Sequence, residues 1–499
     1  MIVMNRKYTN NRSESKNISD IIFVVLLFSS VSFLVCSGCS SNWFHPSLPL
    51  TDSSVFHYIA MLMQDGGVPY RDVFDHKGPL IYFFNYFGQL INGINGVWVF
   101  ELCSIFLTCL FSYSAIRKFC GKKLSALGTV FIILFLKGYL DYGNYVEEYA
   151  LPFISCSIWI FLDYYFNKKS SCLKLIACGF CFMGVMLLRQ NMITTWIVLG
   201  LFAIVYEIHN HPSKLIVYLL WFSLGAAILL LPVLIYLYLN GALVDFWKQY
   251  FLFNFSYSGK TVVSRAQAIW QFFWTIPGVF PFLILGITFL TSEDNHIISI
   301  IFIINCTISL IMIGLSGRTY MHYGIVLIPL SIVPMGMMLK FLEDNSKSRN
   351  SLVLCCILAL LVVIYPWVNK VFGLNTNSPI AQSTEGVISA FIKQNTTPDE
   401  TIMSLGNQDI FYVLSERKSA SKYSYQMPIA MIDKSIYDTV SKDIRAAMPA
   451  VILIHEPAPG SDFKMDVLQH IVDSFVEEHN YEYKRKVNNY TIYLRESLN

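Results

Sequence analysis

Charged residues are scarce in this chain. Only 14% of its 499 residues are Asp, Glu, Lys or Arg, whereas 55% are apolar and 15% are aromatic. Soluble domains carry about 25% charged residues, so this composition, with a mean hydropathy of +0.50, excludes an ordinary soluble protein. The net charge of +3 is spread over many loops and forms no basic face, so no nucleic acid partner is expected. An integral membrane protein is predicted.

Cysteine is missing from the last part of the chain, since none of the twelve lies beyond Cys356. Most cysteines fall within or beside apolar runs, and no CxxC pair stands in a polar segment of the kind that holds a metal. They are therefore interpreted as small core residues. The chain also has no fixed-period repeat and no long low-complexity tract, which leaves a change of composition near residue 369 as the one clear domain boundary.

Long apolar runs are abundant. A helix needs about 20 apolar residues to span a bilayer, and about eleven runs qualify. They cover approximately residues 21–35, 97–116, 124–140, 150–166, 173–188, 192–208, 215–238, 269–290, 297–315, 324–341 and 351–367. The aromatic-rich segments 80–91 and 239–268 are expected to be amphipathic helices on the outer membrane surface. The second can serve as an aromatic belt that anchors the chain at the lipid interface, or it can border a groove for a lipid substrate.

Charge asymmetry sets the predicted orientation. Residues 1–18 carry four basic side chains, which favours a cytoplasmic N-terminal tail. Alternating the spans from there leaves lysine mainly in the inside loops and carboxylates, Tyr and Asn in the outside loops. Residues 19–368 are assigned to a multi-pass domain of the cell membrane, with a first extracytoplasmic loop at 39–96.

The segment 369–499 has the composition of a soluble domain. Helices are predicted near 384–396, 408–419, 433–448 and 462–480, strands at 401–406 and 450–456, and a closing hairpin at 481–496. Alternating strands and helices predict a small α/β domain, which an odd number of spans places outside the cell. Its expected role is acceptor binding or stabilisation, since it shows no cluster with catalytic character.

Ionisable residues concentrate in the predicted outside loops. The stretch from Asp52 to Pro79 directly follows the first span and is rich in charged side chains. Ionisable groups at membrane depth are costly and tend to serve function. We expect one polar cavity at the outer face to collect the ionisable residues of these loops, which include Asp52, Asp72, Asp75, His76, Lys77, Asp141, Glu147, Glu148, Arg189, Arg265, Arg318 and His322.

Such a cavity would suit a lipid-linked substrate, whose tail stays in the bilayer while its phosphate lies at the interface. Arg and Lys can hold the phosphate by charge-assisted hydrogen bonds, and a carboxylate can deprotonate an incoming hydroxyl. The carboxylate could equally act through a bound ion, so a divalent cation is a candidate cofactor. The metal ligands are left open.

Several features lie in these loops: Asp52 just past the first span, GGVPYRDVFDHKGPLIYF, NYVEEYALPF, LLRQN and GRTYMHY. Together they resemble the bacterial GT-C membrane glycosyltransferases, which include protein mannosyltransferase-like and aminoarabinose transferase-like enzymes. The likeness covers roughly the first 340 residues. It implies an α-helical polytopic membrane fold and an inverting transfer of a sugar from a polyprenyl-phosphate donor to a hydroxyl acceptor on the extracytoplasmic face.

The resemblance also implies roles for single residues. An acidic residue in the first outside loop is the usual catalytic base, and Asp52 occupies that place, with Asp72 or Asp75 next. The expected contacts of the donor phosphate are His76, Lys77, Arg189, Arg318 and His322, and those of the acceptor or sugar are Glu147 and Glu148. The chain lacks the long lumenal insertion of protein mannosyltransferases, so a cell-surface glycan, a teichoic-acid-like polymer or a lipid is the expected acceptor.

Each of these residues also has a structural alternative. Asp52 is well placed to cap a helix, and the DHKGP segment can be a solvated turn. Glu147 and Glu148 can favour a helix N-terminus, and Arg189 can extend to the lipid interface. Two rival functions stay open: a polymer ligase or polymerase that uses diphosphate-linked oligosaccharides, and a transporter of lipid-linked sugars, which would place charges at mid-membrane and show inverted repeats.

Overall fold

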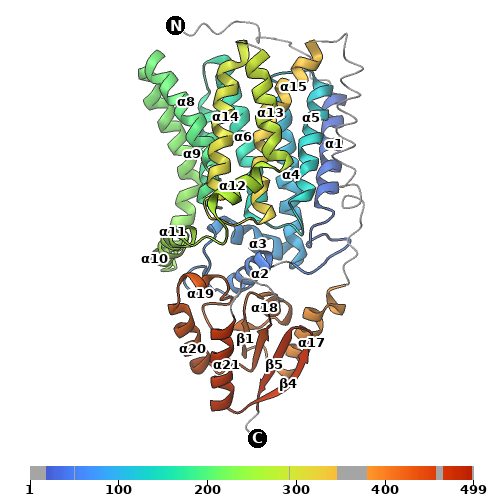
Figure 1. Ribbon diagram of the computed structural model, residues 1–499, viewed down its shortest axis with the longest axis vertical. Coiled ribbons are helices and arrows are strands. Elements are labelled where there is room, and N and C mark those ends of the chain that lie inside the picture. Colours follow the sequence, from blue (N-terminus) through green and yellow to red (C-terminus); the bar gives the residue numbers. More distant parts are fainter. Residues whose placement is uncertain (1–17, 50, 292, 345–378, 457–464, 497–499) are drawn as a thin grey trace. The chain divides into compact units, whose positions relative to one another are not determined.

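The computed structural model describes residues 18–49, 51–291, 293–344, 379–456 and 465–496 (Figure 1). These residues form two compact units. The first contains the described parts of 1–39, 98–235 and 261–374. The second contains the described parts of 40–97, 236–260 and 375–499.

The first unit is a bundle of apolar helices, in which α1, α4, α5, α6, α13 and α14 run side by side (Figure 1). Helix α6 is its centre, since it packs against α4, α7 and α8, and 83% of its apolar window is buried, against 11% for α9. An apolar helix that is exposed along its length is typical of contact with lipid. The helices of this unit are α1 Ile18–Cys36, α4 Trp98–Ile116, α5 Lys122–Leu134, α6 Val146–Asn167, α7 Cys172–Met186, α8 Thr194–Asn210, α9 Pro212–Leu239, α12 Arg265–Phe273, α13 Ile276–Thr291, α14 His296–Gly314 and α15 Ile332–Asp344.

Six helices are long and apolar enough to cross a membrane, or seven if one bent pair counts as a single span, among the residues that the structure describes. The chain is therefore a multi-pass membrane protein. The expected count of about eleven spans is not confirmed, because several predicted spans correspond to shorter helices, such as α5 and α7. The predicted span at 351–367 lies outside the described residues.

Two helices that the sequence predicts as continuous are interrupted in the structure. The expected span 269–290 is broken into α12 and α13, which are bent by 71°. Pro277 explains the break, because a proline ring clashes with the carbonyl four residues earlier, here that of Phe273, where α12 ends. The expected helix 239–268 runs only from Leu243 to Gly259, as α10 Leu243–Phe246, the π-helical η5 Trp247–Leu252 and α11 Phe253–Gly259.

The second unit contains the predicted α/β domain. Its five-stranded sheet has the order β2-β1-β3-β5-β4, with β1 parallel to β2 and β3, and β5 antiparallel to β3 and β4. Strands β1 and β3 are buried along nearly their whole length, as expected where helices cover both faces. The elements are α17 Thr384–Asn395, β1 Thr401–Leu405, α18 Ile410–Ser415, β2 Lys418–Ser419, α19 Ile429–Ile432, α20 Ser435–Ala447, β3 Val451–His455, α21 Asp466–Glu478, β4 Tyr481–Val487 and β5 Tyr490–Arg495.

The first loop packs with this domain. Its helices are α2 Thr51–Gln64 and α3 Pro79–Asn92, the latter matching the helix expected at 80–91 and carrying proline in its first turn. Helix α2 contacts α18, and the Tyr58 hydroxyl accepts the backbone N–H of Ser419 at 2.8 Å. The loop and the C-terminal domain thus share one unit, while the expected boundary near residue 369 lies outside the described residues.

Candidate functional site

Asp52 and Lys77 form an ion pair within the second unit. Asp52 lies in the first turn of α2, and Lys77 lies just before Gly78, which caps the N-terminus of α3. The Lys77 Nζ is 3.4 Å from the Asp52 Oδ2, and their side chains are 12% and 37% exposed. The pair therefore joins a carboxylate and an ammonium group at a solvent-accessible point.

The loop that carries Lys77 is held by hydrogen bonds to its backbone. The Tyr70 hydroxyl donates to the Lys77 carbonyl at 2.7 Å, and the Tyr82 hydroxyl lies 3.3 Å from the same oxygen. The Gln249 side chain donates to the Tyr70 carbonyl at 2.7 Å. Tyr70 has a φ of 69°, a conformation that such contacts must stabilise in a non-glycine residue. Lys77 is thus presented by a rigid segment.

Asp75 is buried, with 2% of its surface exposed. Its Oδ2 accepts the Tyr82 hydroxyl at 2.8 Å and its Oδ1 accepts the Tyr425 hydroxyl at 2.9 Å. Burial raises the pKa of Asp75, although the Lys77 charge and the two tyrosine hydrogen bonds oppose that rise. Both carboxylate oxygens are engaged, so the geometry favours a structural role in joining the first loop to the C-terminal domain.

His76 and Asp72 are also fixed by neighbours. The His76 Nδ1 is 2.9 Å from the Asn254 Oδ1, and the Asn254 amide donates to the His76 carbonyl at 2.7 Å. Asp72 pairs with Arg71 at 2.7 Å and accepts the Val68 N–H at 2.8 Å. The Arg71 hydrogen bond lowers the pKa of Asp72 despite its partial burial. Asp72 thus closes a local turn at the surface.

Glu147 and Arg189 form an ion pair within the first unit. Glu147 lies in the first turn of α6 and is 2% exposed at its side chain, whereas the Arg189 side chain is 17% exposed. The Arg189 guanidinium also stacks 4.0 Å from the centre of the Tyr323 ring. The sequence around Arg189 does not indicate Glu147 as its partner, because Glu147 lies 42 residues earlier in the chain.

His322 stands beside this pair. Its ring stacks on Tyr145 at 4.3 Å with an interplanar angle of 8°, and it neighbours Tyr323. Arg318 is 4% exposed and donates to the Ser316 carbonyl at 3.2 Å. The structure thus brings Glu147, Arg189 and His322 together in one unit and Asp52 and Lys77 together in the other. That these two sets share one cavity stays a prediction.

Glu148 lies elsewhere in the first unit, fully buried next to Glu101. Both carboxylates accept the backbone N–H of Asn144, the Glu101 Oε1 at 2.7 Å and the Glu148 Oε2 at 3.0 Å. The expected contact between Glu148 and a sugar therefore has no support from its position. Sequence reasoning missed Glu101, since a single acid inside an apolar run gives no sign of its partner.

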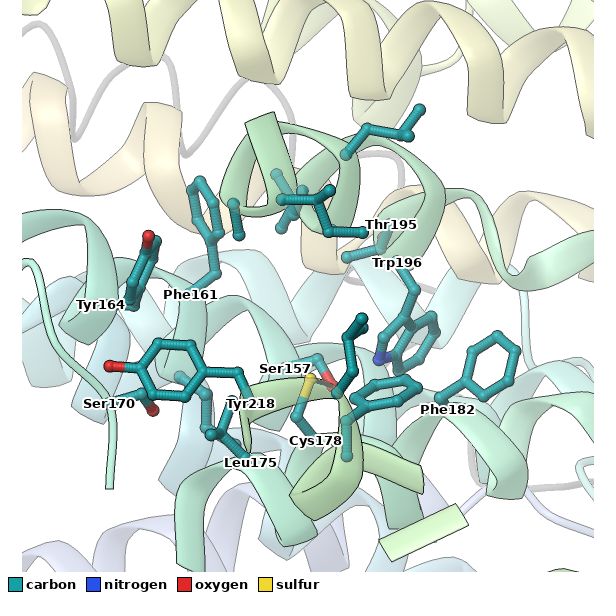
Figure 2. A pocket seen from close by; sticks show the side chains of 18 of the residues that line it. Ser157, Phe161, Tyr164, Ser170, Leu175, Cys178, Phe182, Thr195, Trp196 and Tyr218 are labelled. Atoms are coloured by element: carbon teal, nitrogen blue, oxygen red, sulfur yellow. Dashed lines mark hydrogen bonds between the residues drawn. The ribbon is translucent and has the colours of Figure 1, made fainter. Parts of the chain in front are cut away.

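An apolar cavity of about 490 Å³ lies between α6, α7, α8 and α9. Figure 2 shows Phe161, Phe182 and Trp196 among its lining side chains. Glu207, which also lines the cavity, accepts the Tyr164 hydroxyl at 2.7 Å. A predominantly apolar lining of this kind suits a hydrocarbon chain rather than a polar ligand.

The fold is similar to that of known GT-C proteins. ArnT from Cupriavidus metallidurans bound to undecaprenyl phosphate is 12% identical, with 96% of this chain and 98% of that chain covered and a TM-score of 0.61. The apo state of the same protein is 13% identical, with 95% and 98% covered and a TM-score of 0.63. Archaeal oligosaccharyltransferase AglB from Archaeoglobus fulgidus, in complex with an inhibitory peptide and a dolichol-phosphate, is 11% identical, with 88% and 69% covered and a TM-score of 0.51.

These likenesses confirm the GT-C fold that the sequence features predict. A search of curated proteins finds no match. The family described as the putative competence-induced protein Ccs4 N-terminal domain matches residues 11–360. Because this match covers more than half of the 499 residues, the chain belongs to that family.

Proposed function

We propose that this protein is a membrane glycosyltransferase that moves a sugar from a polyprenyl-phosphate donor to a hydroxyl acceptor at the extracytoplasmic face. The ion pair between Asp52 and Lys77, at 3.4 Å, carries the proposal, because a carboxylate can accept a proton and the neighbouring ammonium group can bind phosphate. The GT-C fold, which this chain shares with a protein solved with undecaprenyl phosphate, supports a lipid-linked donor.

In the proposed reaction, the acceptor oxygen forms a bond to the anomeric carbon while the bond from that carbon to the phosphate oxygen breaks. The polyprenyl phosphate leaves with the bonding electrons, and attack from the opposite side inverts the configuration. Asp52 takes the proton of the acceptor hydroxyl. Lys77 stabilises the charge that develops on the leaving phosphate.

The cluster of Arg189, His322 and Glu147 is the proposed second contact region for the donor. Arg189 keeps its full charge at any physiological pH, and a guanidinium binds phosphate oxygens by paired hydrogen bonds. Glu147 holds the guanidinium in place and can accept hydrogen bonds from sugar hydroxyls. Arg318 is a further proposed phosphate contact, and a divalent cation is a candidate cofactor.

The donor tail needs an apolar environment. The cavity between α6 and α9 offers one, because its lining is mainly aliphatic and aromatic (Figure 2). The C-terminal domain is proposed to face the outside and to position the first loop, since Tyr425 of that domain hydrogen-bonds to Asp75, two residues before Lys77. The proposed acceptor is a cell-surface glycan, a teichoic-acid-like polymer or a lipid.

Purified protein in lipid nanodiscs tests the proposal with a panel of polyprenyl-phosphate hexoses and acceptor glycans. The comparison is between wild type, Asp52→Asn and Asp65→Asn. Asp65 is the matched control, because it follows the same helix and also pairs with a lysine, Lys418, at 3.2 Å. We expect Asp52→Asn to reduce turnover at least about a hundredfold, with donor binding retained, and Asp65→Asn to retain turnover.

Turnover of Asp52→Asn at the wild-type rate would remove Asp52 as the base. A wild-type protein that transfers sugar only from diphosphate-linked oligosaccharides would favour the polymerase alternative. Movement of the lipid-linked sugar across the bilayer without transfer would favour the transporter. Assays with and without a chelator decide whether a divalent cation takes part.

A further inference from the structure

Two cysteines and a glutamate meet at one buried point of the first unit. Cys36 ends α1, Cys39 follows three residues later, and Glu148 lies in the first turn of α6. One ligand atom from each lies within 4.8 Å of the other two. This is the one such group of His, Cys, Asp or Glu side chains found in the part of the chain that the structure describes.

The Glu148 carboxylate has an unsatisfied oxygen at this point. Its Oε2 accepts the Asn144 N–H at 3.0 Å, whereas its Oε1 is buried without a hydrogen-bond partner. Glu148 is 0% exposed, and the adjacent Glu101 is also 0% exposed. Burying a carboxylate oxygen without a partner is costly. A retained proton or a bound cation would remove that cost, and the two thiols beside Glu148 are groups that bind a cation.

Among the residues that the structure describes, no lysine or arginine donates to the Glu148 Oε1. The nearby Lys137 donates instead to the Leu34 carbonyl at 3.4 Å and the Ser37 hydroxyl at 3.3 Å. A disulfide between Cys36 and Cys39 would also leave this oxygen unsatisfied. A cation held by both sulfurs and by the Glu148 Oε1 satisfies all three groups at once.

The surrounding backbone is shaped to hold the cluster. Asp141, Gly143 and Asn144 have φ angles of 41°, 79° and 60°, which turn the Asn144 N–H toward the two carboxylates. A Cβ on Gly143 would clash with Glu101 and would lie 2.6 Å from the Cys39 Sγ. Strained backbone of this kind persists only where its surroundings stabilise it, and it concentrates at binding sites.

We propose that Cys36, Cys39 and Glu148 bind a divalent transition-metal ion of the zinc class. Zinc takes thiolate sulfur at about 2.3 Å and carboxylate oxygen at about 2.0–2.2 Å, which places two tetrahedral sulfurs about 3.8 Å apart. The three ligand atoms all lie within 4.8 Å of one another, a limit that such a geometry satisfies. Binding releases the two thiol protons. Glu101 or water completes the coordination.

The ion would fasten the end of α1 to the start of α6. It would also fix the turn at 141–145, which immediately precedes α6 and contains Tyr145, the stacking partner of His322. The site is thus structural and separate from the proposed transfer chemistry at Asp52. It is a binding site in its own right and does not depend on the glycosyltransferase proposal.

Metal analysis of the full-length protein, purified without chelator, tests this site. The variants are Cys36→Ser/Cys39→Ser, Glu148→Gln and the control Cys178→Ser/Cys181→Ser. The control pair has the same CxxC spacing in α7, but the Cys178 Sγ approaches the Ser157 hydroxyl at 3.9 Å instead of a carboxylate. We expect about one zinc ion per chain in wild type and control, almost none in Cys36→Ser/Cys39→Ser, and affinity reduced at least about tenfold in Glu148→Gln.

Cobalt substitution of wild-type protein gives a second measurement that requires no variant to fold. We expect the intense near-ultraviolet absorption of thiolate-to-cobalt charge transfer. Wild-type protein without bound zinc or this absorption would overturn the proposal, as would unchanged metal content in Cys36→Ser/Cys39→Ser. An intact disulfide between Cys36 and Cys39 in unreduced wild-type protein would also overturn it.

Discussion

The Tyr425 hydroxyl donates a 2.9 Å hydrogen bond to the Oδ1 of Asp75, a residue 350 positions earlier in the chain. Both side chains are buried. Asp75 also accepts the Tyr82 hydroxyl at 2.8 Å. This carboxylate is therefore the point where the loop that carries Lys77, the start of α3 and the C-terminal domain are joined.

Removing the Tyr425 hydroxyl takes one donor from a buried carboxylate oxygen, the Asp75 Oδ1, which keeps the His76 N–H at 2.6 Å. We expect Tyr425→Phe to lower the free energy of unfolding of the second unit by about 1–3 kcal/mol. Pulse proteolysis in increasing urea, applied to the full chain in nanodiscs, measures this change. Tyr423→Phe is the matched control, because the Tyr423 ring packs on Phe74 at 5.1 Å and keeps that contact without its hydroxyl. Equal stabilities of the two variants would contradict the prediction.

We expect Asp409 to make the stability of the C-terminal domain depend on pH. Burial raises its pKa to about 7, although the Ser424 hydroxyl opposes this rise. An unfolded Asp titrates near about 3.9, so between about pH 4 and 7 the folded state binds more protons, and the free energy of unfolding falls as pH rises. Asp409→Asn cannot lose a proton. We expect it to be more stable than wild type at pH 8 by on the order of a few kcal/mol.

This gain should shrink to less than about 1 kcal/mol near pH 4, where the Asp409 carboxyl is protonated in the folded state and about half protonated in the unfolded state. Urea midpoints of wild type and Asp409→Asn, measured between pH 4 and 8 by the same proteolysis, give the difference directly. A difference that stays constant over this range would contradict the assignment of the pH dependence to Asp409.

Arg189 tests the proposed donor contacts. If its guanidinium binds the donor phosphate, Arg189→Ala should raise the KM for donor at least about tenfold, since one charge-assisted hydrogen bond contributes about 1.5–3 kcal/mol. Arg445→Ala is the control, because Arg445 also pairs with a glutamate, Glu478, at 3.0 Å but lies in the C-terminal domain. An unchanged donor KM in Arg189→Ala would remove Arg189 from the phosphate site.

Gly143 tests the strained turn beside the two buried glutamates. Its φ of 79° disfavours a side chain, and a Cβ there would meet Glu101 and Cys39. We expect Gly143→Ala to lower the thermal midpoint of the first unit, with a loss of about 1–3 kcal/mol. Gly200→Ala in α8 is the control, because a Cβ there meets nothing within 4 Å. Alanine in a helix should preserve or slightly raise stability.

Most helices and strands of the C-terminal domain could be predicted from sequence patterns. The helices predicted near 384–396 and 433–448, the strands at 401–406 and 450–456, and the closing hairpin all appear in the structure. Their periodicity is local, so neighbouring residues suffice to predict them. The two-residue strand β2 was not predicted, because it is defined only by its parallel pairing with β1.

The bends of the membrane helices could not be predicted from such patterns. Apolar runs predict helices without indicating where they bend, so 269–290 appeared continuous although Pro277 marks the break. The candidate site residues could be recognised from the sequence because ionisable residues are rare in this chain. Their partners could not, since Glu147, Tyr425 and Glu101 lie far along the chain from the residues they contact.

The sequence by itself determined that this is a membrane protein with a C-terminal α/β domain, because composition and local periodicity decide which segments avoid water. Its motifs added a resemblance to the GT-C fold, which the structural similarity confirms. Only the tertiary structure decided that Asp52 pairs with Lys77, that Asp75 is a buried tether, and that Cys36 and Cys39 meet Glu148. The physical reason is that charge pairing, burial and metal coordination depend on distances in space, which residues far apart in the chain acquire only when it folds.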